Sequence, residues 1–575
     1  MKHKDHFDTR RNFLCRSACA SLGVTSIVNT LAHLRLMQSA VAQSTPADYK
    51  AVVCLFLYGG NDSNNTLLPL DGAARANYEA SRARPAGHWL NIPASGTNPT
   101  SGLPAALSLN APSGGFGQTA AATQFGVHPY MTNTRDLFNS GDLAFVANVG
   151  TLVQPIPNQA AYASPGVPKP PQLFSHSDQQ LQWQSSLPDR PFQNGWGGRA
   201  AELLTAANAN PDGKVSMNIS IAGQNSFQVG SSVVQYAVST GGVTALAGYN
   251  NTNGPYGAAA LSPHLTPYAT TPPSYAANDQ GKALKALDTI TKLTRMQLGE
   301  SECLYQHHLE EGYNEVMKRA RDNETFVGDA IGSNTDTVTL AVNDAFDYAY
   351  GWAGGTATRP TLPDVANQLK MTIRLIRGRN FLGNKRQIFF VSMGGYDTHQ
   401  NQVSDSGTNQ NVGHNRLMGD LDKALKGFRD AIAVISSAEG LTGQGLWNDV
   451  TLFTNSDFTR TLNPNGSVRE SGTDHAWGGH QIVMGGAVNG QRIYGNFPTL
   501  AISSGLDVDI SANSRGRWIP TLAVEQFGSD IAKWFMSSGS QYLPGITGAD
   551  LATIFPNLAR FQTVGSEIGF MDFSA

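Results

Sequence analysis

The sequence predicts an α/β fold with a mostly parallel central sheet that is flanked by helices. Apolar runs rich in β-forming residues recur along the chain, and each ends at glycines or at a polar turn. Segments with helical spacing of apolar residues lie between them. The 575 residues are 40% hydrophobic and only 14% charged, which supplies enough apolar side chains for a large core.

Four segments are predicted as strands. Each is short and almost continuously apolar, which is typical of a strand buried on both faces of a parallel sheet. The four segments are 51–58, 143–149, 387–393 and 450–454. The first, third and fourth end in turns that carry an aspartate, and the second stops at Gly150.

Helices are predicted at 365–379, 417–435 and 522–534, because apolar residues recur on one stripe of each segment. A longer helix is predicted over 282–321. Strands that alternate with such helices favour a parallel sheet whose crossovers are helical.

We expect residues 43–575 to form one large domain with long insertions. The insertions are expected near 85–125, 151–172 and 247–364, where Pro, Gly, Asn and Ser are frequent or the strand and helix patterns are interrupted. No internal repeat is present in the sequence.

The first 42 residues are predicted to be an export signal of the twin-arginine (Tat) type. Arg10 and Arg11 precede a short, weakly apolar segment, and Ala40-Val41-Ala42 is a typical cleavage site. We therefore expect a periplasmic or secreted protein that meets the Tat translocase during export. The alternative is an amphipathic helix that belongs to the mature fold.

Charge, hydropathy and cysteine content exclude several classes of protein. The net charge of −3 argues against a globally basic nucleic-acid binder. No apolar run after the leader is long enough to span a membrane. Cys54 and Cys303 are the cysteines that follow the leader, and they could form one disulfide, or Cys54 could be a buried thiol.

Three predicted strands end near an aspartate: Asp62, Asp397 and Asp457. The carboxyl ends of parallel strands meet at one edge of a sheet, where clustered carboxylates need a cation or protons. Asp474, His399 and His475 follow these strands closely. This set predicts one or two divalent ions, Zn²⁺, Mn²⁺ or Ca²⁺, at that edge. Alternatively, each aspartate caps a helix.

Two further residues are candidates for catalysis. Ser175 or Ser177 could open a helix and act as a nucleophile, with Ser175 the preferred candidate, or the serine could be an ordinary N-cap. Arg460 could hold an oxyanion in bidentate fashion, or it could pair with a carboxylate. His176 could be a metal ligand or a core residue.

Motifs of several enzyme classes are missing from the sequence. It contains no G-x-S-x-G, no Walker A loop, no complete G-x-G-x-x-G after a strand, no C-x-x-C and no H-E-x-x-H. Their absence argues against lipase-type hydrolases, P-loop nucleotidases, nicotinamide enzymes and zincins.

Seven motifs in this order resemble the Tat-exported domain-of-unknown-function family 1501. They are the twin-arginine leader, Tyr58-Gly59-Gly60-Asn61-Asp62, Ser175-His176, Gly195-Trp196-Gly197-Gly198-Arg199, Gly394-Gly395-Tyr396-Asp397-Thr398-His399, Ser456-Asp457-Phe458-Thr459-Arg460 and Gly472-Thr473-Asp474-His475. The resemblance runs from about Tyr49 to Phe561. It implies a fold similar to that of the alkaline phosphatase and sulfatase superfamily, with metal ligands at strand ends and a nucleophile at a helix start.

The function expected from the resemblance is the metal-dependent hydrolysis of phosphate or sulfate esters, either small molecules or polymer-borne. A non-catalytic periplasmic binding or assembly protein that keeps the fold is the alternative. Two departures favour the alternative: Asn401 and Phe458 stand where active phosphatases usually have histidines.

Overall fold

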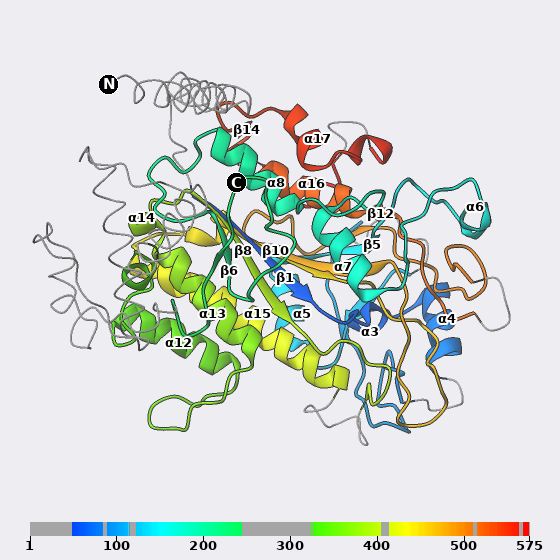
Figure 1. The fold of residues 1–575 in the computed structure, drawn as a ribbon. Helices are drawn as coiled ribbons and strands as arrows, with labels where there is room; N and C mark the ends of the chain where they lie inside the picture. Colours follow the sequence, from blue (N-terminus) through cyan, green and yellow to red (C-terminus); the bar gives the residue numbers. More distant parts are fainter. Residues whose placement is uncertain are drawn as a thin grey trace, which may run out of the picture.

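The computed structural model describes most of the chain after the leader (Figure 1). The described residues are 49–83, 89–112, 114–115, 122–243, 323, 326–403, 413–509, 514–562 and 567–573. The predicted export signal, the predicted helix over 282–321 and Cys303 lie outside these residues.

A nine-stranded sheet forms the centre of the described chain, with the order β11-β5-β10-β9-β1-β8-β6-β7 and β12 paired to β5. Its strands are β1 (Lys50–Leu57), β5 (Leu143–Gly150), β6 (Asn218–Ser220), β7 (Tyr236–Ala237), β8 (Arg386–Met393), β9 (Val450–Ser456), β10 (Gly479–Gly485), β11 (Ile493–Gly495) and β12 (Leu522–Ala523). All pairs are parallel except those of β10 with β5 and β9.

Strand β1 lies between β8 and β9 and is parallel to both. Leu57, the last residue of β1, is opposite Met393 on β8 and Ser456 on β9. All three strands therefore end at the same level of one sheet edge.

Helices cover both faces of the sheet (Figure 1). One face carries α5 (Thr132–Asn139), α12 (Thr337–Ala349), α13 (Asp364–Arg377) and α15 (Gly413–Ala438). The other carries α7 (His176–Ser185), α8 (Trp196–Ala206) and α16 (Val524–Phe535). The result is a three-layer α/β/α arrangement, as the alternation of apolar strands and amphipathic helices predicts.

The remaining elements are short and lie in the connections. The helices are α3 (Ser63–Thr66), α4 (Gly72–Arg82), α6 (Gln159–Ala163), α14 (Arg379–Leu382) and α17 (Leu551–Ile554), with 3₁₀ turns at Gly445–Asp449, Gly548–Asp550 and Leu558–Arg560. A three-stranded sheet contains β2 (Leu67–Pro69), β4 (Phe125–Val127) and β3 (Leu107–Ser108), and β13 (Ser537–Ser538) pairs with β14 (Gln541–Tyr542).

The alternating side chains of β1 face two different apolar clusters. Val53 and Leu55 contribute to the cluster under α13 and α15, whereas Val52, Cys54 and Phe56 contribute to the cluster under α8 and α16. Burial on both faces explains why this strand is a continuous apolar run. Cys54 is fully buried there, and it forms no disulfide within the described part of the chain.

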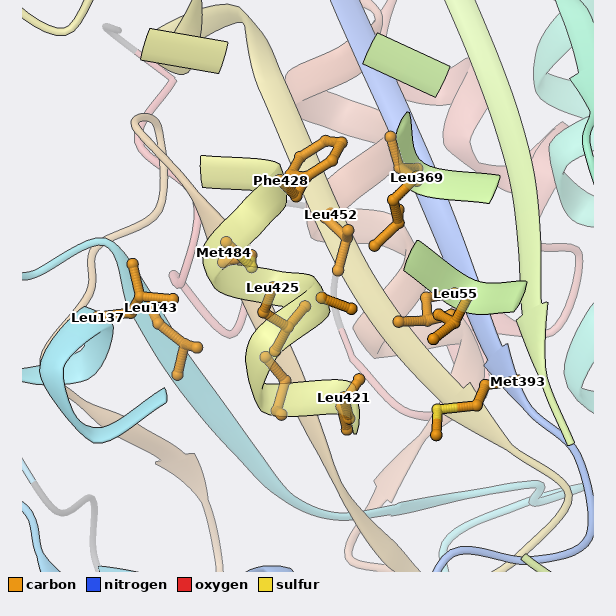
Figure 2. Packing of buried hydrophobic residues seen from close by; sticks show 14 of the residues in the cluster. Leu55, Leu137, Leu143, Leu369, Met393, Leu421, Leu425, Phe428, Leu452 and Met484 are labelled. Carbon is orange, nitrogen blue, oxygen red and sulfur yellow. The ribbon is translucent and has the colours of Figure 1, made fainter. Parts of the chain in front are cut away.

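Helix α15 packs its apolar stripe onto the sheet (Figure 2). Leu421, Leu425 and Phe428 are fully buried and lie beside Leu452 of β9 and Leu369 of α13. This is the stripe that the sequence predicts for residues 417–435, and the helix extends beyond it at both ends.

The four predicted strands and the three predicted helices that fall in the described residues are confirmed, with shifts of a few residues at their ends. The helix predicted over 522–534 starts as strand β12 and becomes helical at Val524. The insertions expected near 85–125, 151–172 and 247–364 hold β3, α6 and α12 among their described residues. No described helix combines the length and apolar character that crossing a membrane requires.

Replacing Leu425 with alanine should lower the free energy of unfolding by about 2–5 kcal/mol, because it leaves a cavity in this layer. Urea denaturation of the full chain measures the change. Leu441→Ala is the control, since Leu441 is 43% exposed and loses little burial. Equal effects of the two substitutions would contradict the described packing.

Candidate metal centre

Three polar segments meet where β1, β8 and β9 end. The turn after β1 contains Gly59 and Gly60, the loop after β8 carries Asp397, and Asp457 directly follows β9. The Gly59 N–H lies 3.3 Å from each carboxylate oxygen of Asp457. Contact between these segments follows from the parallel pairing of their strands.

Gly59 and Gly60 make the close approach of these segments possible. Both have positive φ angles, +111° and +81°. A Cβ atom on Gly59 would lie 2.4 Å from the backbone nitrogen of Asp397, and one on Gly60 would lie 2.4 Å from the ring of Phe458. Only glycine fits at either position.

Three imidazoles surround one oxygen of Asp397. The Nε2 atoms of His176, His399 and His475 lie 3.4, 3.1 and 3.5 Å from Asp397 Oδ1. His399 Nε2 is also 2.9 Å from His475 Nε2. These four residues are referred to below as the His–Asp centre.

The other nitrogen of each imidazole faces an atom that can only accept a hydrogen bond. His176 Nδ1 is 2.6 Å from the Asp457 carboxylate, His399 Nδ1 is 3.0 Å from that of Asp474, and His475 Nδ1 is 2.7 Å from the carbonyl oxygen of Phe174. Each Nδ1 therefore carries the proton and donates it. In the neutral rings, all three Nε2 atoms then direct lone pairs toward the centre, as in metal sites with outer carboxylate or carbonyl partners.

The donor set fits a divalent ion. His176 Nε2 is buried and has no hydrogen-bond partner in the described chain. The facing Nε2 lone pairs of His399 and His475 repel each other unless a cation or a proton lies between them. Ligand atoms from His176, Asp397 and His475 all lie within 4.8 Å of one another. Two ligand atoms of one tetrahedral zinc ion lie roughly 3.3 Å apart, close to the 2.9–3.5 Å that separate Asp397 Oδ1, His399 Nε2 and His475 Nε2.

The His–Asp centre is open to solvent on one side. The side chains of Asp397 and His399 are 48% and 41% exposed, whereas Asp457 behind them is fully buried. Water or a small ligand can therefore reach the side chains of Asp397 and His399, whereas His176 Nε2 and Asp457 are enclosed.

The surrounding charges shift the protonation of the centre. The hydrogen bond to Asp457 raises the pKa of His176 above its usual value, against the effect of burial. Burial acts to raise the pKa of Asp397, but Arg460 and the neighbouring histidines outweigh burial and lower it. Burial lowers the pKa of His475. Asp397 is therefore an anion at neutral pH, and a proton competes with a cation for His176 Nε2.

Arg460 supports Asp397 from the enclosed side. Its side chain is fully buried, and Nη1 donates to Asp397 Oδ1 at 2.7 Å and to the Gly59 carbonyl at 3.2 Å. Its Nε and Nη2 groups donate to Thr473. All three of its nitrogens are thus engaged within the protein, and Arg460 pairs with a carboxylate, which was the alternative to binding an oxyanion.

Phe458 occupies a position where the resemblance would place a histidine. Its ring lies 4.8 Å from that of His176 and 4.7 Å from that of His475, measured between centroids. It is buried and packs against both imidazoles. The third imidazole of the centre comes instead from His176, at the start of α7.

Five of the six predicted metal ligands meet here, in two groups. Asp397, His399 and His475 lie in the His–Asp centre. Asp457 and Asp474 lie outside the centre. They accept the hydrogen bonds that orient the rings of His176 and His399, respectively. Hydrogen bonds from Gln180 and Asn465 hold these two outer carboxylates in turn.

Asp62 is not brought to the centre. It is fully buried, and its two oxygens accept hydrogen bonds from Arg82 at 2.7 and 3.0 Å. Gln402 Nε2 donates to the same carboxylate. Burial acts to raise the pKa of Asp62, but Arg82 outweighs it and the pKa is lowered. Its oxygens are saturated by an internal ion pair, which explains why this strand-end aspartate does not contribute a ligand.

Ser175 is the N-cap of α7, immediately before His176. Its hydroxyl lies 2.6 Å from a carboxylate oxygen of Asp178 and does not cap the helix. The prediction that a serine opens a helix here is confirmed, and a carboxylate that could accept the hydroxyl proton lies beside it.

Sequence reasoning left the role of His176 open and did not single out Gln180. Their spacing of four places both on one face of a helix, and Gln180 Nε2 donates to Asp457 at 2.9 Å. A histidine and a glutamine one helical turn apart, directly after a predicted N-cap, are the signal that could have identified this pair.

Arg82→Met should destabilise the fold by about 3–5 kcal/mol, because it leaves the Asp62 carboxylate buried without its counter-charge. Urea denaturation measures the change, and Asp62→Asn in the same chain should restore part of the loss. Arg135→Met, at an exposed ion pair, is the control and should cost less than about 1 kcal/mol. If Arg82→Met leaves the free energy of unfolding unchanged, the ion pair of Arg82 with Asp62 does not stabilise the fold.

Comparison with protein families matches residues 49–508 to the family described as "Protein of unknown function (DUF1501)". No curated protein and no solved structure matches the chain. The match covers most of the chain and includes the sheet strands β1 to β11 and every member of the His–Asp centre. The chain therefore belongs to the DUF1501 family of proteins of unknown function.

Proposed function

We propose that this protein is a metal-dependent hydrolase whose ion is held by His176, His399, His475 and Asp397. The observation that carries the proposal is the convergence of three Nε2 atoms on one carboxylate oxygen, each ring being fixed through its Nδ1. Imidazole and carboxylate ligands favour zinc or manganese over calcium, which prefers oxygen ligands.

The open side of the centre supports a catalytic role. A divalent ion there would stabilise the negative charge that develops during hydrolysis of an ester. Ser175 would attack the phosphorus or sulfur of the ester while Asp178, whose oxygen is 2.6 Å from the hydroxyl, accepts its proton. The proton would pass to the alcohol that leaves, and water would then release phosphate or sulfate from the serine.

Two arginines at the rim favour an anionic substrate. The Arg517 guanidinium lies 4.7 Å from the ring centre of Phe174, whose carbonyl binds His475, and its buried Nε has no hydrogen-bond partner among the described residues. Arg515 pairs with Asp474 at 2.8 Å, and Asp474 holds His399. Both arginines therefore contact residues that position His475 or His399, and Arg517 also lies 3.8 Å from Asp509. Guanidinium groups suit the oxygens of a phosphate or sulfate ester.

We also propose that the protein is exported and that it is distantly related to a known superfamily of hydrolases. The leader that resembles a Tat signal supports export of the folded protein to the periplasm or beyond. Strand-end ligands on a mostly parallel sheet support a distant relationship to the alkaline phosphatase and sulfatase superfamily.

A metal-binding or assembly protein without catalysis is the second candidate. Three histidines and one aspartate make four ligands, and a tetrahedral zinc site with four protein ligands is usually structural. That observation supports a binding role if all four residues hold the ion at once.

The purified full-length protein should contain about one equivalent of zinc or manganese, which elemental mass spectrometry of a chelator-free preparation measures. His176→Ala and Asp397→Ala should each lower the metal content and affinity at least about tenfold, since each removes a ligand. Uptake should also weaken as pH falls, because the raised pKa of His176 lets a proton compete for Nε2.

Asp62→Asn is the matched control for these two variants. It also changes a strand-end aspartate, but one whose oxygens bind Arg82, so the metal content should be unchanged. Metal loss in this variant with an intact fold, or full metal retention in Asp397→Ala, would contradict the assignment of ligands.

Arg517→Met should raise the KM for an aryl phosphate or aryl sulfate about tenfold, because it removes a charged donor from the rim. Steady-state hydrolysis of both esters by the metal-loaded protein provides the measurement. Arg135→Met, far from the centre in sequence and paired with Asp136, should leave KM unchanged. If a metal-containing preparation hydrolyses neither ester, the non-catalytic candidate is favoured.

A further inference from the structure

Phe174 has a backbone conformation that is rare for a bulky residue. Its φ angle is +72°, in the left-handed region, where the Cβ atom of an L residue crowds the following carbonyl oxygen and the conformation costs free energy. Glycine, and to a lesser degree asparagine, occupy this region readily. Phe174 is neither, so the surrounding contacts have to hold it there.

Contacts of the ring and of the preceding chain hold Phe174 in this conformation. The Arg517 guanidinium lies over the ring, 4.7 Å from its centroid, and the ring packs against the apolar cluster that contains Trp477. Earlier in the chain, the Pro171 carbonyl accepts a hydrogen bond from Gln182 Nε2 of α7 at 2.9 Å. Both sides of the residue are fastened, which leaves the backbone at 174 little freedom to relax.

The left-handed conformation directs the Phe174 carbonyl at His475, whose Nδ1–H donates to it at 2.7 Å. The backbone of His475 is fixed separately, since it forms a β-bridge with Arg460. A change of φ at Phe174 from +72° to the usual value of about −63° would rotate the chain about the N–Cα bond by roughly 135°. The carbonyl could not then stay on His475 while the residues before Phe174 keep their contacts.

Phe174 also precedes two residues with proposed roles. Ser175 is the N-cap of α7, and His176 opens the helix and directs Nε2 toward Asp397. The Ser175 N–H donates to the Gln172 carbonyl at 3.1 Å, so a tight turn ends where the helix begins. Three consecutive residues thus contribute a carbonyl, a hydroxyl and an imidazole, and the conformation at 174 affects how these groups are arranged.

We propose that Phe174 is a positioning residue, whose left-handed backbone, anchored by its ring, holds the His475 imidazole with Nε2 directed at the site of the ion. The proposal rests on the proposed function, since that function places an ion at the His–Asp centre. The side chain of Phe174 acts on the ion indirectly, through the backbone conformation and the carbonyl. The requirement at this position is therefore a residue that keeps a positive φ.

Zinc titration of the chelator-treated full-length protein tests the proposal with two matched substitutions. Phe174→Asn and Phe174→Val both remove the ring, but asparagine tolerates a positive φ and the β-branched valine does not. Phe174→Val should therefore bind zinc at least about tenfold more weakly than Phe174→Asn, the loss typical of disturbing the partner of a metal-binding histidine. Equal affinities, or tighter binding by Phe174→Val, would overturn the proposal.

Leu173 provides the control position. It packs against the same apolar cluster as Phe174, but it is not among the residues with a positive φ. Leu173→Val should bind zinc at least as tightly as Leu173→Asn, because valine keeps apolar packing that asparagine loses. If asparagine is favoured at both positions, the polarity of the new side chain explains the result and the proposal is overturned.

Phe174→Gly and Phe174→Ala repeat the comparison with a smaller difference, in case Phe174→Val does not fold. The two variants differ by one methyl group, and only glycine adopts a positive φ without cost. Phe174→Gly should therefore bind zinc more tightly and unfold at a higher urea concentration than Phe174→Ala. Equal or greater stability and affinity of Phe174→Ala would overturn the proposal.

Crystal structures of the metal-free variants separate this proposal from the proposed function. The hydrogen bond from His475 Nδ1 to the carbonyl of residue 174 should persist in Phe174→Asn and be broken in Phe174→Val. If this difference is found but the wild-type protein binds no zinc, the assignment of ligands fails and the positioning of the His475 ring by Phe174 stands. If the hydrogen bond survives in Phe174→Val, the positioning role is refuted even when the wild-type protein binds zinc.

Discussion

Parallel pairing of β1 with both β8 and β9 is the constraint on which the rest of the site depends. Because the three strands end at one level, the residues that follow them have to share a small volume. Gly59 and Gly60 let the backbone of that volume approach closely, and the loops after β8 and β9 then bring Asp397 and Asp457 toward the start of α7. A change of strand order would separate these groups by at least one strand spacing of about 4.8 Å.

The His–Asp centre is built in layers that balance charge. Asp397 Oδ1 is contacted by three imidazoles and by the guanidinium of the buried Arg460. Behind the imidazoles are the Asp457 and Asp474 carboxylates and the Phe174 carbonyl. Each group is oriented by its outer partner, so the positions of the three Nε2 atoms and of Asp397 Oδ1 are set by the sheet, by α7 and by these hydrogen bonds.

The sequence was sufficient to predict the elements with strong local patterns. The strands at 51–58 and 387–393 and the α15 stripe were predictable because both faces of a buried strand, and one face of a helix, require apolar residues. Strand β10 was not predicted: its apolar stretch is short and bounded by glycines, and its antiparallel direction depends on distant partners. Similarly, the ion pair of Asp62 with Arg82 joins two elements whose proximity no local pattern reveals. The same limit applies to His176, whose partner Asp457 is 281 residues away.

The exposure of Asp397 and His399 has a kinetic consequence. A buried ion can leave only when the chain around it opens, so that its lifetime is tied to unfolding. In the His–Asp centre, solvent reaches the carboxylate and one imidazole directly, while Arg460 and Asp457 stay enclosed. An ion held there would exchange with the surrounding solution while the fold stays closed. The compartment in which the protein works, rather than the one in which it folds, would then decide which metal it carries.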